Sequence, residues 1–98
     1  TTKTSLLDPR STRPKQPLEA FPLDTLSMVG ILEQNDQLWG LIKDPQNIVH
    51  RVQVGNYMGQ NEGRIIEINE SAVDLVEIIP DGIGGYIERD ASIAIGGN

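Results

Sequence analysis

The stretch Ile48-Val-His-Arg-Val-Gln-Val-Gly-Asn-Tyr-Met-Gly-Gln-Asn-Glu-Gly-Arg-Ile-Ile-Glu-Ile68 decides the fold class of this chain. Along residues 48–54, successive side chains are expected to point to opposite faces, which is the two-residue period of a β-strand. Glycines at positions 55, 59 and 63 punctuate the loop that follows, and residues 64–68 again favour a strand. This order of strand, glycine-rich loop and strand predicts a β fold.

The segments on both sides of this stretch repeat the pattern. Turn residues separate short apolar runs rich in β-branched side chains, and no segment has a helical stripe of apolar residues. The sequence therefore predicts an all-β domain, a small β-sandwich of about seven short strands, with a core of Leu, Ile and Val around Trp39. The further predicted strands cover residues 25–32, 38–42, 72–79, 86–89 and 92–95, of which the last two could be one strand bent near Asp90.

The first quarter of the chain differs in composition from the rest. Four of the six prolines lie in residues 1–24, and all ten glycines lie after them. Residues 1–24 hold four basic and three acidic residues, whereas residues 25–98 hold four basic and eleven acidic ones. Few apolar side chains are available to offset the entropy of ordering residues 1–24. We predict a flexible, disordered, Pro-rich arm at 1–24, whose Leu18–Leu23 stretch packs on the domain as an extended lead-in, and a folded domain at 25–98.

Length and composition exclude several classes of protein. With 98 residues and a net charge of −6, the chain is one small acidic domain with a tail, which argues against sequence-independent nucleic-acid binding. No apolar run approaches the ~20 residues of a membrane-spanning helix. The absence of cysteine excludes disulfides, a thiol nucleophile and cysteine-ligated zinc. Because the sequence begins at Thr1, we expect a processed or truncated chain.

No set of residues predicts catalysis. His50 is the single histidine, in the middle of a predicted strand, and we expect a structural role for it. Most carboxylates are expected on the solvated surface, and the glycines fit turns and close crossings better than a phosphate loop. We predict no enzymatic activity, metal or cofactor. A small-ligand or glycan site stays open as an alternative and would need the aromatic residues Trp39, Tyr57 and Tyr86.

Three motifs, in this order, resemble the type IV pilus assembly lipoprotein family PilP. They are Phe21-Pro-Leu-Asp-Thr-Leu-Ser-Met-Val-Gly30, then Val52-Gln-Val-Gly-Asn-Tyr-Met-Gly-Gln-Asn61 with Gly63 and Arg64, and Leu75-Val-Glu-Ile-Ile-Pro-Asp-Gly-Ile-Gly-Gly-Tyr-Ile-Glu-Arg89. The resemblance runs from Leu18 to Ile95. The same layout is similar to the homology region of a type II secretion inner-membrane component, which is shorter over Asp81–Arg89, so that assignment also stays open.

The resemblance implies a non-enzymatic periplasmic β-sandwich without a cofactor. It implies that the arm starts at a lipidated cysteine in the inner membrane, upstream of this sequence. It further implies that the arm binds the inner-membrane proteins PilN and PilO, and that the domain docks on the periplasmic N-domain of the secretin PilQ.

We expect two groups of residues to make these contacts. The anchors expected in the arm are Leu6, Leu7, Leu18, Phe21 and Leu23. On the domain, an exposed sheet edge or face is expected to dock, with Arg51 or Arg64 as polar rim. The apolar residues expected there are Met28, Val29, Ile31 and Leu41. The alternatives are an inert spacer for the arm and plain core for the apolar residues. The basic residues Lys3, Arg10, Arg13 and Lys15 are expected to be solvated or to touch anionic lipid.

Overall fold

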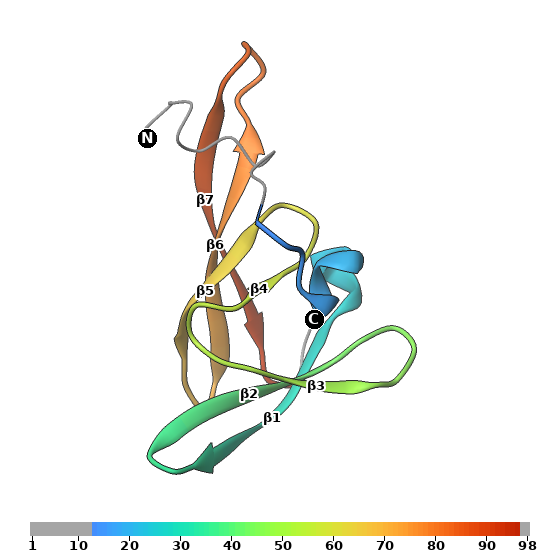
Figure 1. Cartoon of the computed structure of the whole chain (residues 1–98), viewed down its shortest axis with the longest axis vertical. Coiled ribbons are helices and arrows are strands. Elements are labelled where there is room, and N and C mark those ends of the chain that lie inside the picture. Colours follow the sequence, from blue (N-terminus) through green and yellow to red (C-terminus); the bar gives the residue numbers. More distant parts are fainter. Residues whose placement is uncertain (1–12, 97–98) are drawn as a thin grey trace.

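The computed structural model describes residues 13–96, which form two antiparallel sheets (Figure 1). One sheet has three strands in the order β1-β2-β3, and the other has four in the order β4-β5-β6-β7. The predicted all-β class and the number of strands are confirmed. The elements are η2 (Pro17–Ala20), η3 (Leu23–Thr25), β1 (Ser27–Gln34), β2 (Gln37–Lys43), β3 (Val49–Val52), β4 (Tyr57–Met58), β5 (Gly63–Ile68), β6 (Ala72–Pro80) and β7 (Tyr86–Ala94), where η marks a short 3₁₀ helix.

Short turns set the register of the three-stranded sheet. Asn35 and Asp36 join β1 to β2 with φ of 54° and 64°, and a two-residue hairpin loop of this kind favours Asn and Asp because both tolerate positive φ. Between β2 and β3, Asn47 N donates to Asp44 O at 2.9 Å, as the predicted turn requires. The Asp44 side chain also accepts a bond from His50 Nε2 at 2.8 Å. His50 therefore has the structural role that its sequence predicts.

The four-stranded sheet is built on one long hairpin. β6 and β7 pair without interruption from Ala72–Ala94 to Pro80–Tyr86. Residues 86–94 thus form one strand rather than two short ones, and the sequence had left both arrangements open. β4 lies inside the glycine-rich loop. No strand was predicted there, because two paired residues are too few to give an alternating pattern.

The core lies between the two sheets, and Trp39 is not in it. β2 alternates, so that Gly40 and Ile42 are buried while Trp39 is only half-buried on the opposite side of the strand. The prediction of a core around Trp39 is therefore wrong. The buried cluster consists of Leu18, Leu26, Met28, Ile42, Val52, Met58, Ile65, Ile68, Val73, Leu75 and Ile93.

Part of the predicted arm belongs to the folded domain. Leu18 is only 3% exposed and lies in the core cluster, and Leu18 O accepts a bond from Gly59 N at 3.0 Å. The lead-in is not extended as expected, because η2 and η3 turn the chain twice before β1. Burial of apolar side chains offsets the cost of ordering these residues. Residues 1–12 of the predicted arm lie outside the described residues.

The loop from Gly59 to Gly63, which we call the hub loop, touches both the amino-terminal segment and β6. A Cβ on Gly63 would lie 2.5 Å from Leu75 Cδ1 and 2.6 Å from Met58 O, so no side chain fits there. On the other side of the loop, Asn61 O accepts a bond from Ile78 N at 2.8 Å. Glycine at position 63 lets this loop approach the sheet closely enough to make these contacts.

Replacing Gly63 should test this constraint. Gly63→Ala should lower the free energy of unfolding by about 2 kcal/mol or more, because the added methyl group meets the backbone oxygen of Met58. Gly30→Ala is the matched control, since its Cβ would meet only Leu41 Cδ1, at an ordinary 3.7 Å. Urea unfolding of both variants provides the measurement. Equal stability of the two variants would contradict the proposed constraint.

Candidate partner-docking site

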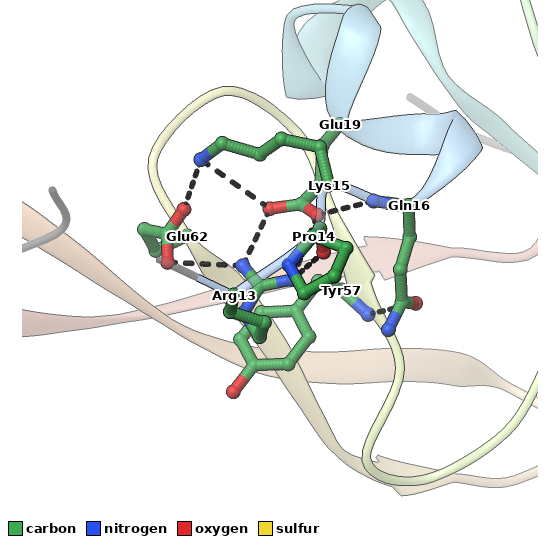
Figure 2. A network of polar contacts seen from close by, with 7 residues as sticks. All are labelled: Arg13, Pro14, Lys15, Gln16, Glu19, Tyr57 and Glu62. Carbon is green, nitrogen blue, oxygen red and sulfur yellow. Dashed lines mark hydrogen bonds and ion pairs between the residues drawn. The ribbon is translucent and has the colours of Figure 1, made fainter. Parts of the chain in front are cut away.

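A cluster of charged side chains fastens the amino-terminal segment to the hub loop (Figure 2). Arg13 donates to both carboxylate oxygens of Glu19, at 3.0 and 2.8 Å, and to Glu62 Oε1 at 2.9 Å. Its guanidinium lies over the Tyr57 ring, with Cζ 3.5 Å from the centroid, and Lys15 Nζ bonds to Glu62. We call these five residues the N-terminal clamp. Bidentate arginine pairs of this kind are among the stronger polar contacts in proteins.

The clamp corrects the expectation for several charged residues. Arg13 and Lys15 were expected to be solvated or near lipid, but both pair with carboxylates of the folded domain. Among residues 13–96, four carboxylates are buried rather than solvated, because each one accepts hydrogen bonds that replace water. They are Glu19, Asp44, Glu62 and Glu77.

The clamp favours the ionised form of Glu19. Burial raises the pKa of its carboxyl, but bonds from Arg13, from the Gln16 N–H at 2.7 Å and the charge of Lys15 outweigh burial. The pKa of Glu19 therefore lies below its ordinary value. A carboxylate with a lowered pKa contributes stability above its unfolded pKa, and this contribution is lost as pH falls through the folded pKa.

The side of the three-stranded sheet that faces away from the core carries apolar and cationic side chains. Because Ile42 is buried, its neighbours Leu41 and Lys43 point to the opposite side of β2, as does Trp39. Cross-strand partners share a face, so the register adds residues from β1 and β3 to this side. We call this surface the outer face, and it comprises Leu32, Trp39, Leu41, Lys43, Val49 and Arg51.

Arg51 and Trp39 form the polar centre of the outer face. The Arg51 Cζ lies 4.6 Å from the centroid of the Trp39 ring, and Arg51 Nη1 donates to Gln34 Oε1 at 3.2 Å. A cation–π contact at an exposed site contributes about 0.5–1 kcal/mol. The pair holds a large aromatic side chain and a guanidinium in fixed positions at the surface.

The predicted contact residues fall into separate places. Leu41 and Arg51 lie on the outer face, Val29 is 46% exposed at a bulge of β1, and Ile31 is exposed opposite Gly40. Leu18 and Met28 are buried in the core, so in this structure neither is available as a surface contact. Phe21 and Leu23 are half-buried against the core, Arg64 is exposed on β5 of the other sheet, and Leu6 and Leu7 lie outside the described residues.

Sequence reasoning missed Leu32, Trp39 and Val49 as surface residues. For Trp39 a signal was available, because positions 39, 41 and 43 share a strand face and Lys43 marks that face as solvated. The hydrophobicity of Trp39 was given more weight than its position. No comparable sequence pattern predicts the N-terminal clamp, because its residues are separated by up to 49 positions in the chain.

Neither a metal cluster nor a set of gathered aromatic rings is found among the described residues. Across residues 13–96, no group of three or more His, Asp or Glu side chains is placed to hold a metal ion, and no helix is long and apolar enough to cross a membrane. The aromatic residues that a glycan site would need lie on three different strands: Trp39 on β2, Tyr57 on β4 and Tyr86 on β7. Arginine side chains cover two of these rings.

Comparisons with known proteins all match one protein family. A family model described as "Pilus assembly protein, PilP" matches residues 1–95. The curated "Type IV pilus inner membrane component PilP" of Pseudomonas aeruginosa is 41% identical over 90 residues, which are 92% of this chain and 51% of that protein. The chain thus spans about half the length of this relative.

Solved structures of similar domains have the same fold. A domain of the type IV pilus biogenesis lipoprotein PilP from Pseudomonas aeruginosa matches with a TM-score of 0.78 and 43% identity, over 86% of this chain and 95% of that one. A domain of the Neisseria meningitidis PilP pilot protein matches with a TM-score of 0.70 and 36% identity, over 98% and 84% of the two chains.

The clamp predicts a specific dependence of stability on pH. At pH 7, Glu19→Gln should lower the free energy of unfolding by about 1–3 kcal/mol, because Arg13 loses an ionised partner. As pH falls through the lowered pKa of Glu19, the wild-type protein loses this advantage and the two stabilities should converge. Urea unfolding between pH 2 and 7 provides the measurement. Parallel curves for the two proteins would contradict the role given to Glu19.

Proposed function

Since this chain belongs to the PilP family of pilus assembly proteins, we propose that it is a non-enzymatic adaptor that links two parts of the type IV pilus machine. In this proposal the N-terminal arm binds the inner-membrane proteins PilN and PilO. The outer face and the neighbouring edge of β1 dock on the periplasmic N-domain of the secretin PilQ. The protein acts in the periplasm, tethered to the inner membrane by a lipid on a residue upstream of Thr1.

One observation carries the docking proposal: exposed apolar side chains concentrate around the three-stranded sheet. Val29, Ile31 and Leu32 are exposed on β1, and Val49 is 51% exposed on β3. Exposed apolar groups gathered on one part of a small domain are a mark of protein contact. Tryptophan and arginine, which meet here as Trp39 and Arg51, are also the residue types most enriched among strong interface contacts.

The β1 edge supports docking by strand pairing. β1 pairs with β2 on one side, and on its other side only a single parallel bridge from Met28 to Ile95 is formed among residues 13–96. The backbone from the bulge at Val29 onward can therefore receive a partner strand. A strand added here would lie next to the exposed side chains of Val29 and Ile31.

The N-terminal clamp supports the proposal for the arm. It joins Arg13 to Glu19 and to Glu62 of the hub loop, so the chain enters the folded domain at a defined point. Leu6 and Leu7 stay proposed anchors for PilN and PilO, whereas Leu18 serves the fold. Phe21 and Leu23 keep some exposed surface beside the clamp.

Docking on the secretin can be tested with charge reversals. Arg51→Glu should weaken binding to the purified secretin N-domain by about tenfold, because it places a carboxylate over Trp39 and removes a cation from the outer face. Arg64→Glu is the matched control on the other sheet and should bind within about twofold of wild type. Isothermal titration calorimetry provides the measurement. Wild-type affinity of the Arg51 variant would remove the outer face from the docking site.

The role of the arm can be tested by truncation at the clamp. A chain that starts at Arg13 keeps every described contact, so its unfolding midpoint should match that of the full chain. We expect it to lose at least tenfold in affinity for a purified PilN–PilO complex, since Leu6 and Leu7 are gone. Leu6→Ser with Leu7→Ser in the full chain is the companion variant. Unchanged affinity of both variants would make the arm a spacer.

A further inference from the structure

The β6–β7 hairpin extends beyond its sheet as a two-stranded ribbon. Pairing of β5 with β6 ends at Val76, whereas β6 and β7 continue to pair as far as Pro80 and Tyr86. In Figure 1 this ribbon stands clear at one end of the long axis, and the three-stranded sheet lies at the other end. An isolated two-stranded ribbon is marginally stable in water, so this one needs support from its own side chains.

The base of the ribbon is fixed by an ion pair between the buried carboxylate of Glu77 and the exposed guanidinium of Arg89. Glu77 is 2% exposed, and its Oε1 accepts bonds from Arg89 Nε and Nη2 at 3.2 and 2.8 Å. Its other oxygen accepts a bond from Asn61 Nδ2 at 3.4 Å, and Ile78 N donates to Asn61 O at 2.8 Å. Because a buried carboxylate must keep these partners, the ribbon has a defined direction relative to the hub loop.

The tip of the ribbon is fixed by Asp81. Its Oδ1 accepts the N–H of Ile83 at 2.8 Å and of Gly85 at 2.9 Å, and its own N–H donates to Gly85 O at 3.0 Å. Gly82 and Gly84 have φ of 88° and 95°, which are strained for other residues. The loop therefore has a specified conformation rather than a loose one.

This conformation places Ile83 in solvent. Its side chain is 77% exposed and is the most exposed large apolar group in residues 13–96. By contrast, Ile79 and Ile87 are directly opposed across the ribbon and half-buried, which explains them as a cross-strand pair. Folding of the ribbon does not account for an isoleucine at its tip. An apolar side chain on an ordered backbone binds at a lower entropic cost than one on a loose loop, because the backbone does not have to be ordered when the partner arrives.

The charges near the tip indicate what it contacts. Glu88 is exposed within the ribbon opposite Ile78, whereas Asp90 is exposed at its base opposite Val76, and Arg89 between them is paired with Glu77. The whole chain carries a net charge of −6, so an anionic lipid surface would repel it. A protein pocket with Lys or Arg at its rim would instead complement the Glu88 carboxylate of the ribbon.

We propose that the β6–β7 tip is a second docking element, in which Ile83 enters an apolar pocket with a cationic rim on a partner protein of the pilus machine. The element lies at the opposite end of the domain from the outer face, so both surfaces can be occupied at once. The choice of partner proteins rests on the proposed function, whereas the geometry of the tip does not.

The test compares Ile83→Ser with Ile83→Val and Ile66→Ser in the full chain. Ile66 is also exposed and lies on β5 of the same sheet, so it controls for the loss of one surface apolar group. Each variant is titrated with two purified probes, the secretin N-domain and the PilN–PilO complex. Ile83→Ser should lower the affinity for one probe at least tenfold, with Ile83→Val within about threefold and Ile66→Ser unchanged. The unfolding midpoint of Ile83→Ser should equal that of wild type.

Several results would overturn the proposal. Wild-type affinity of Ile83→Ser for both probes would refute the tip while leaving the outer face intact. Failure of the wild-type chain to bind either probe would refute the proposed function itself and remove the partners of the tip. Ile83-dependent sedimentation with phosphatidylethanolamine–phosphatidylglycerol vesicles would make the occupant a membrane. An affinity that does not fall as salt rises from 50 to 300 mM would contradict the cationic rim.

Discussion

The domain depends on the close approach of the hub loop, Gly59–Gly63, to the strands around it. Gly63 leaves no room for a side chain beside Leu75, and this close approach lets the loop hold two separate parts of the chain, the amino-terminal segment and the ribbon. Its backbone binds Leu18 of the amino-terminal segment, Asn61 binds the base of the β6–β7 ribbon, and Glu62 accepts both cations of the N-terminal clamp. One loop therefore positions both the amino-terminal segment and the ribbon.

This arrangement suits a small adaptor. A domain of this size buries little apolar area and cannot rely on its core alone for rigidity. Here charge-assisted bonds at the clamp and at the Glu77–Arg89 pair add rigidity where the chain leaves the core. The consequence is a domain whose entering chain and ribbon both have a defined direction relative to the hub loop.

Local patterns predicted the strands well, because alternation and turn residues act over a few positions. The turn at Asp44, the structural role of His50 and the general course of β5 and β6 follow from neighbours in the sequence. The sequence could not predict that Arg13 contacts Glu62, since the two residues are 49 positions apart and only the complete fold brings them together. Trp39 lies outside the core because the alternation of side chains along β2, rather than hydrophobicity, decides on which side of the strand it lies. The motif at residues 75–89 is visible in the sequence, but only the structure shows that the Ile83 side chain is exposed to solvent.

The most direct test of the adaptor account is a chemical-shift map of the ¹⁵N-labelled domain titrated with unlabelled secretin N-domain. The account predicts that the largest backbone shifts occur on β1 and around Trp39, Leu41 and Arg51, together with protection of the β1 amides from exchange. Shifts that leave both β1 and the outer face unchanged, at a concentration where the complex is formed, would contradict it.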